Sequence, residues 1–150
     1  MLKTAVAALA LTLLVAAPAF AKGHDKDNHR QGSHHEYSPL QIVQRHMKFV
    51  AKGDVDGILG DFAKDGVTLT AGKQTSGKAN LRKLVSGVVG PGKPVIHPLK
   101  IWSDGDVGIV AWEIGGGTPN SVRGTDSFLV RHGKIAVQAV WVGGNQPKLD

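Results

Sequence analysis

The spacing of hydrophobic residues changes along the chain, and this change predicts the fold. From residue 38 to about residue 89, apart from an alternating stretch at 67–71, apolar residues recur every three or four positions, as in amphipathic helices. From residue 95 onward they alternate with polar residues, as in half-buried strands. Helices followed by a run of strands are typical of α+β organisation. We therefore expect three N-terminal helices packed on a strongly curved, mainly antiparallel sheet.

The first helix has clear boundary signals. Ser38 can cap its free N–H groups, Pro39 suits its first position, and Gln41 completes a capping box. Gly53 suits the left-handed residue that ends a helix. An apolar stripe follows this helix, and His46 lies at the edge of the stripe.

Two shorter helices are expected next. Asp54 caps the second, whose apolar face ends with Phe62. The third is expected from about residue 77 to residue 89, with Ser76 as its cap and Val88 in its buried stripe. Residues 72–76 are expected to form a turn. The predicted strands cover residues 67–71, 95–102, 107–114, 122–131 and 135–142.

The first 21 residues resemble a secretory signal peptide. Lys3 precedes an apolar stretch over residues 5–17, and an A-x-A cleavage site ends at Ala21. The apolar stretch is shorter than the about 20 residues that cross a bilayer. We expect cleavage after Ala21 and a periplasmic or secreted protein that is not held at a membrane; a retained anchor is the alternative. The predicted segments are therefore a signal peptide (1–21), a disordered leader (22–37), one domain (38–144) and a C-terminal tail (145–150).

The leader concentrates potential metal ligands. It holds His24, His29, His34 and His35, with carboxylates between them. Imidazoles and carboxylates in a short tract can bind a divalent metal such as zinc, copper or nickel. The spacing matches no closed tetrahedral site, so a solvated linker is the alternative.

Composition excludes several classes of protein. The 150 residues include no cysteine, so disulfides and thiolate metal sites are excluded. The net charge of +6 is scattered, with Arg82-Lys83 as the adjacent basic pair, whereas a nucleic-acid-binding protein usually concentrates its charge on one face. We therefore expect no nucleic-acid partner. Gly115-Gly116-Gly117 lacks the helix and lysine that phosphate-binding loops need, and no cofactor is predicted.

Four short motifs of the chain occur together in one known group of domains. Residues 51–58 (AKGDVDGI) match A-x-G-D-x-D-x-[LI], and residues 62–65 (FAKD) match F-A-x-D. Residues 77–81 (GKANL) and the segment GTDSF at 124–128 are the other two. With these motifs the chain resembles the nuclear-transport-factor-2-like superfamily, which includes ketosteroid isomerases and SnoaL-like polyketide cyclases. The resemblance implies a cystatin-like cone of helices on a curved sheet.

The resemblance also implies candidate catalytic positions. The tyrosine that donates to the oxyanion in the isomerases falls on His46, and the aspartic acid that completes the oxyanion hole falls on Asp126. The general-base aspartate falls on Thr70, whose hydroxyl is too weak a base for work near neutral pH. Whether the protein is an enzyme therefore stays open, with His46 and Asp126 as the candidate acid and base.

Further residues are expected to line an apolar pocket in the cone. The candidates are Phe62, Thr70, Trp102, Trp112, Phe128, Gln138 and Trp141. The alternatives are that the aromatic residues simply fill the core, that His46 bonds a backbone carbonyl, and that Asp126 pairs with Arg123 at a sheet edge.

Three functions follow from these candidates. The first is an exported module that binds a small, mostly hydrophobic molecule. The second is an isomerase, cyclase or dehydratase that uses His46 and Asp126 as acid and base. The third is periplasmic metal binding through the leader. The resemblance also implies a homodimer, since members of this superfamily often pair through the outer sheet face, where Val67 and Leu69 could supply an apolar patch.

Overall fold

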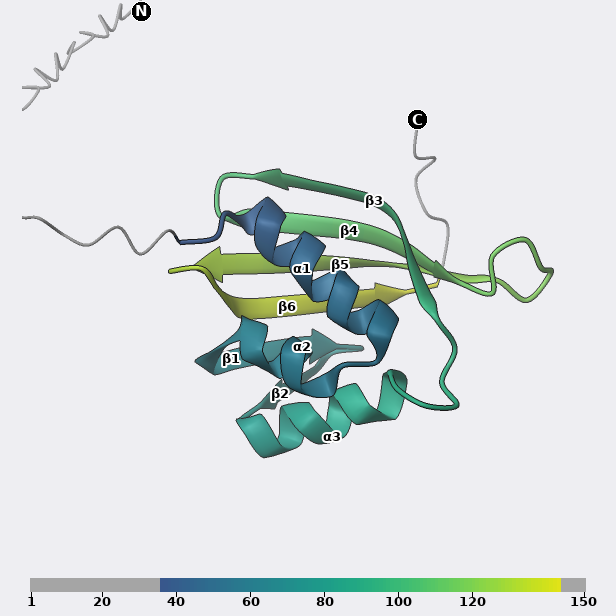
Figure 1. The fold of residues 1–150 in the computed structure, drawn as a ribbon, viewed down its shortest axis with the longest axis horizontal. Coiled ribbons are helices and arrows are strands. Elements are labelled where there is room, and N and C mark those ends of the chain that lie inside the picture. Colours follow the sequence, from purple (N-terminus) through teal and green to yellow (C-terminus); the bar gives the residue numbers. More distant parts are fainter. Residues whose placement is uncertain (1–35, 144–150) are drawn as a thin grey trace, which may run out of the picture. The chain divides into compact units, whose positions relative to one another are not determined.

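The structure, a computed structural model, describes residues 36–143 and shows three helices and six strands (Figure 1). One sheet contains all six strands in the order β2-β1-β6-β5-β4-β3. Strands β1 and β6 are parallel, and the other neighbours are antiparallel. This arrangement confirms the predicted fold class. The elements are α1 (Pro39–Lys52), α2 (Val55–Asp61), β1 (Phe62–Thr70), β2 (Lys73–Ser76), α3 (Lys78–Val88), β3 (Ile96–Asp104), β4 (Val107–Ile114), β5 (Val122–Arg131) and β6 (Lys134–Val142).

Helix α1 begins and ends where the sequence predicts. The Ser38 side chain accepts from the Gln41 N–H, and the Gln41 side chain accepts from the Ser38 N–H. Gly53 ends the helix with φ 66° and ψ 23°, a left-handed conformation that glycine adopts without steric cost. Helix α1 packs across β3, β4 and β5, and this packing buries its apolar stripe (Figure 1).

Four local predictions were wrong. Strand β1 begins at Phe62, which we had placed on the second helix, and residues 63–66 of β1 bulge opposite the single residue 136 of β6. The predicted turn at 72–76 contains the edge strand β2, which pairs with β1. Gly77 rather than Ser76 is the N-cap of α3, and the predicted buried Val88 is 52% exposed. The first two errors concern residues whose position depends on pairing with another strand.

The two faces of the sheet have different surroundings. The inner face, toward the helices, includes Val110, Trp112, Asp126, Phe128 and Gln138. The outer face includes Leu69, Trp102, Ile109, Ser127, Ala139 and Trp141, because alternate residues of a strand point to opposite sides. Among residues 36–143, no helix is long and apolar enough to cross a membrane.

Exposure along the inner face increases toward one end of the strands. Along β5, Phe128 and Val130 are buried beneath the helices, Asp126 follows, and Val122 is 40% exposed. Along β6, Ile135 is fully buried and Val142 is 54% exposed. Asp126 therefore lies between the buried apolar core and the exposed ends of β5 and β6.

The packing of α1 predicts a large stability difference between two apolar helix positions. Replacing Ile42, which is fully buried, with alanine should lower the free energy of unfolding by about 2–5 kcal/mol, because it leaves a cavity under α1. Val88→Ala is the control, since that side chain is largely exposed, and it should change the value by about 0.5 kcal/mol or less. Urea unfolding measures both variants. Equal effects would contradict the placement of α1 on the sheet.

Candidate functional site

Asp126 is held on the inner face by donors from the two neighbouring strands. Trp112 Nε1 on β4 donates to Asp126 Oδ1 at 2.8 Å, and Gln138 Nε2 on β6 donates to Oδ2 at 2.7 Å. The sequence alternative, in which Arg123 pairs with Asp126, was wrong, because Arg123 instead lies 3.5 Å from Glu113 Oε2. Both oxygens of the carboxyl group are thus fixed in position.

Gly124 allows Trp112 to reach this carboxyl group. The two residues are cross-strand partners, and a Cβ added at Gly124 would lie 2.1 Å from Trp112 Cζ2. The indole therefore lies directly against the Gly124 backbone, with its N–H directed at Asp126. A side chain at position 124 would displace the indole.

Burial raises the pKa of Asp126 above that of an ordinary aspartate. Desolvation is the largest cause, because water is removed from a group that would carry charge. The hydrogen bonds from Trp112 and Gln138, and the charge of a protonated His46, act in the opposite direction without cancelling it. Asp126 therefore keeps its proton to a higher pH than a solvent-exposed aspartate does.

His46 lies on α1 beneath the same apolar cover. Its side chain is 2% exposed, and its ring makes edge contacts with Phe62 and Phe128 at centroid distances of 6.0 and 5.3 Å. Phe128, whose ring His46 touches, lies two positions after Asp126 on the same face of β5, so the imidazole and the carboxyl group lie on the inner side of the sheet. Their joint action as acid and base stays a prediction.

Asp61, at the end of α2, is a buried site residue that the sequence analysis missed. Arg45 Nε donates to Asp61 Oδ1 at 2.8 Å, and Arg45 Nη2 lies 2.6 Å from the same oxygen. Asp61 Oδ2 lies 3.3 Å from His46 Nδ1, which is ion-pair distance but not a hydrogen bond by geometry. Both atoms are buried and have no hydrogen-bond partner among the described residues, so each is the polar atom available to the other.

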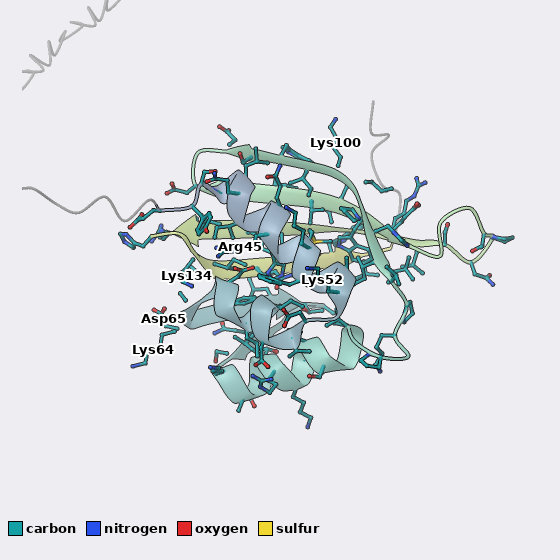
Figure 2. All side chains as sticks on the ribbon, in the orientation of Figure 1. Arg45, Lys52, Lys64, Asp65, Lys100 and Lys134 are labelled. Atoms are coloured by element: carbon teal, nitrogen blue, oxygen red, sulfur yellow. The ribbon has the colours of Figure 1, made fainter. Side chains whose placement is uncertain are left out.

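A signal for Asp61 was present in the sequence. The residue lies three positions after Ile58, on the apolar side of a short helix, so its side chain had to be buried. A buried carboxylate needs a cation or hydrogen-bond donors, and Arg45 is adjacent to His46 in α1. Arg45 Cζ also lies over the Tyr37 ring, 4.2 Å from its centroid. Figure 2 labels Arg45 on α1.

The structure divides the predicted pocket residues between the two faces. Phe62, Thr70, Trp112, Phe128 and Gln138 lie on the inner face with His46 and Asp126.

The prediction that Trp102 and Trp141 line the cone was wrong. Trp102 pairs with Ile109, and Trp141 pairs with Thr125, so both indoles belong to the outer face. Period-2 alternation places each on the side opposite Asp126.

The predicted metal ligands His24, His29, His34 and His35 lie outside the described residues, as does the signal peptide. Metal binding by the leader, export and the segment boundaries therefore stay predictions. Within residues 36–143, there is no group of three or more histidine, aspartate or glutamate side chains arranged to hold a metal ion.

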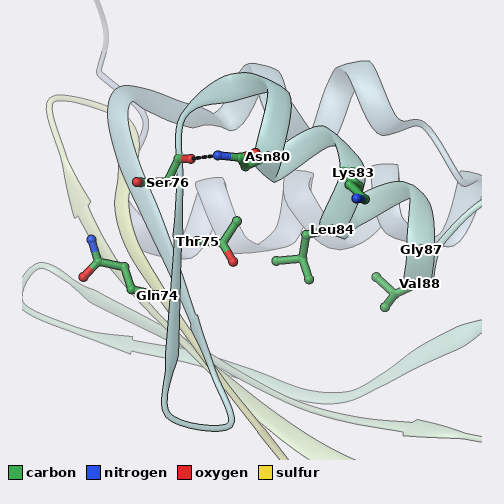
Figure 3. A pocket seen from close by; sticks show the side chains of 8 residues that line it. All are labelled: Gln74, Thr75, Ser76, Asn80, Lys83, Leu84, Gly87 and Val88. Carbon is green, nitrogen blue, oxygen red and sulfur yellow. Dashed lines mark hydrogen bonds between the residues drawn. The ribbon is translucent and has the colours of Figure 1, made fainter.

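Two open hollows lie elsewhere on the domain. One, of about 610 Å³, lies between β2 and α3 and includes Leu84 and Val88 (Figure 3). The other, of about 410 Å³, is formed near Tyr37, Asp106 and His132. Neither His46 nor Asp126 lines these hollows.

Sequence comparison identifies the class of this domain. The SnoaL-like domain family matches residues 43–138, which include His46, Asp61 and Asp126. The chain therefore belongs to the SnoaL-like family of the nuclear-transport-factor-2-like superfamily. A search of curated proteins found no match.

Solved structures agree with this assignment. A nuclear-transport-factor-2-like protein of unknown function from Mesorhizobium loti has a TM-score of 0.60 at 22% identity, over 69% of this chain and 88% of its own. A protein with a ketosteroid isomerase-like fold from Catenulispora acidiphila, solved with trimethylamine, has a TM-score of 0.56 at 16% identity, over 70% and 86%. A cystatin-fold protein from Novosphingobium aromaticivorans has a TM-score of 0.60 at 12% identity, over 69% and 97%. At these identities the likeness shows the fold.

The raised pKa of Asp126 predicts a pH-dependent effect of Asp126→Asn. A carboxyl group whose pKa is raised on folding stabilises the fold below its unfolded pKa of about 3.9, and this contribution is lost as pH rises through the folded pKa. The stability of Asp126→Asn relative to the wild type should therefore increase as pH rises above about 4. Urea unfolding at a series of pH values measures this difference. A difference that is constant with pH, or that falls, would contradict the raised pKa.

Proposed function

We propose that this domain binds a small, mostly apolar molecule against the inner face of its sheet, with Asp126 as the polar anchor. The observation that carries the proposal is the position of this carboxyl group. It is buried among apolar residues, between the core and the exposed ends of β5 and β6, and both its oxygens accept hydrogen bonds, from Trp112 and Gln138. A fixed polar group on an apolar wall is typical of small-molecule sites.

The state of Asp126 indicates the chemistry of the ligand. A protonated carboxyl group can donate a hydrogen bond, and an ionised one can only accept. A hydroxyl group both donates and accepts, so it pairs with Asp126 in either state. Val140 and Val142 on the neighbouring strand favour an apolar body for the same molecule. The trimethylamine bound to the Catenulispora acidiphila protein supports binding of small organic molecules on this scaffold.

A second candidate function is acid–base catalysis of the isomerase, cyclase or dehydratase kind. The observation that favours it is the burial of both His46 and Asp126 on the inner side, with the Phe128 ring against the imidazole. One group could accept a proton from a carbon atom while the other donates a proton to an oxygen atom. Thr70, at the position of the family base, cannot accept that proton. Loss of turnover in His46→Gln, with binding retained, would distinguish the enzyme from the binding module.

Naphthol and naphthalene test the binding proposal, because they differ by a single hydroxyl group. Wild-type protein should bind naphthol about tenfold more tightly, which corresponds to about 1.4 kcal/mol for one hydrogen bond. Asp126→Ala should remove this preference while leaving naphthalene binding in place. Asp104→Ala, an exposed aspartate on β3, is the matched control and should retain the preference. NMR titration measures all four combinations.

Two results would contradict the proposal. One is the absence of saturable naphthol binding to the wild-type protein. The other is an equal preference for naphthol in Asp126→Ala and Asp104→Ala, which would mean that the hydroxyl group does not contact Asp126.

We also propose that two copies of the chain pair through the outer face of the sheet. One row across this face contains four apolar residues, Trp102, Ile109, Ala139 and Leu69, together with Ser127 and Gln74, and Leu69 is 39% exposed. No ionisable side chain belongs to this row, and Trp141 beside it is 48% exposed. An apolar face of this kind is complementary to a second copy of itself in a two-fold dimer.

A charge in the centre of this row should separate the copies. Ala139→Arg places a guanidinium group where two apolar faces would meet, at a cost of several kcal/mol in dimer stability. The dimer should become a monomer at micromolar concentration by sedimentation equilibrium. Lys83→Glu is the control, because Lys83 is an exposed residue of α3, and it should leave the dimer intact. A wild-type monomer, or a dimer that survives Ala139→Arg, would contradict this interface.

A further inference from the structure

The buried groups Arg45, Asp61 and His46 connect α1 to the end of α2. Arg45 directs two nitrogens at Asp61 Oδ1, at 2.8 and 2.6 Å. The second oxygen, Oδ2, lies 3.3 Å from His46 Nδ1. Asp61 is 1% exposed and His46 is 2% exposed, so water does not provide alternative partners for these two atoms. Arg45 therefore binds one carboxylate oxygen, while the other faces His46 Nδ1.

We propose that Asp61 sets the tautomer of His46, so that Nδ1 carries the proton and Nε2 is left as an unprotonated base on the inner side of the cone. Asp61 is thus a positioning residue, and the inference rests on the acid–base alternative of the proposed function. An ionised carboxylate only accepts hydrogen bonds, so the imidazole nitrogen beside Oδ2 must be a donor. In a neutral imidazole, a proton on Nδ1 leaves the lone pair on Nε2.

Charge balance favours a neutral ring. Arg45 is always protonated, and its charge offsets that of Asp61. A neutral His46 gives this buried group of three a net charge of zero, whereas a protonated His46 would add a charge with no counterion in the group. Edge contacts with Phe62 and Phe128 hold the His46 ring in place on the side of α1 that faces the sheet.

The tautomer determines which nitrogen of His46 can accept a proton or a hydrogen bond from a ligand. In this tautomer the lone pair on Nε2 can accept a proton or a ligand hydrogen bond. Asp126, whose pKa is raised by burial, would be the complementary donor when it carries its proton. His46 Nε2 would then provide the proton acceptor that Thr70 cannot provide at the family position. This division of roles requires Asp61 to retain its carboxylate.

A purely structural role for the same contacts makes a different prediction. If Arg45 and Asp61 only tie α1 to α2, the tautomer of His46 is independent of the chemical group at position 61. Asp61→Asn separates the two cases with almost no change in size. The asparagine oxygen should stay with the two donors of Arg45, which turns its NH₂ group toward His46 Nδ1. That NH₂ group needs an acceptor, so the proton of His46 should move to Nε2.

Nitrogen NMR of the full chain measures this tautomer directly. The ring signals of His46 are assigned by their absence in His46→Gln, and spectra are recorded near about pH 8, where an ordinary imidazole is neutral. We expect a protonated Nδ1 and an unprotonated Nε2 in the wild type, and the reverse in Asp61→Asn. Asp56→Asn is the matched control, because Asp56 is an exposed residue of the same helix that pairs with Arg82. This control should leave the His46 signals unchanged.

Each outcome decides the inference. A wild-type ring protonated on Nε2, or one that exchanges equally between tautomers, would overturn it even if Asp61→Asn does not fold. A folded Asp61→Asn variant that keeps the wild-type tautomer would also overturn it. Because no ligand is used, failure of naphthol binding would contradict the proposed function without affecting this result.

Discussion

The hydrogen bonding of Asp126 is the interaction on which the site depends. A carboxyl group on an apolar sheet face is costly unless donors reach both oxygens, and Trp112 and Gln138 meet this need from the strands on either side. This arrangement requires the register of β4, β5 and β6 and the absence of a side chain at Gly124. The sheet pairing therefore fixes the orientation of one functional group.

The two buried carboxyl groups of the domain are treated differently by their surroundings. Asp61 faces a guanidinium group, which balances its negative charge. Asp126 faces neutral donors, and the removal of water is the largest influence on its pKa. His46 lies close to both, in contact with Asp61 and within the electrostatic range of Asp126. Such contrasting environments allow one small apolar site to hold an acceptor and a donor at the same time.

The sequence predicted most of the fold because its signals are local. The capping box at Ser38, the apolar stripe of α1 and the alternation along β5 each act within a few residues. The features that the sequence did not predict depend on pairing between strands. They are the existence of β2, the start of β1 at Phe62, and the placement of Trp102 and Trp141 on the outer face. For the site, His46 and Asp126 were found through family motifs, whereas Asp61 was missed because its partners come from another helix.

The account depends on the inner face being a ligand surface rather than only a closed core. Residues 36–143 also form a hollow between β2 and α3, which gives an apolar molecule a competing place to bind (Figure 3). A crystal structure of the full protein with naphthol tests the two directly. The account predicts naphthol on the inner face, with its hydroxyl oxygen within about 3 Å of an Asp126 oxygen. Naphthol between β2 and α3, with the inner face unchanged, would contradict it.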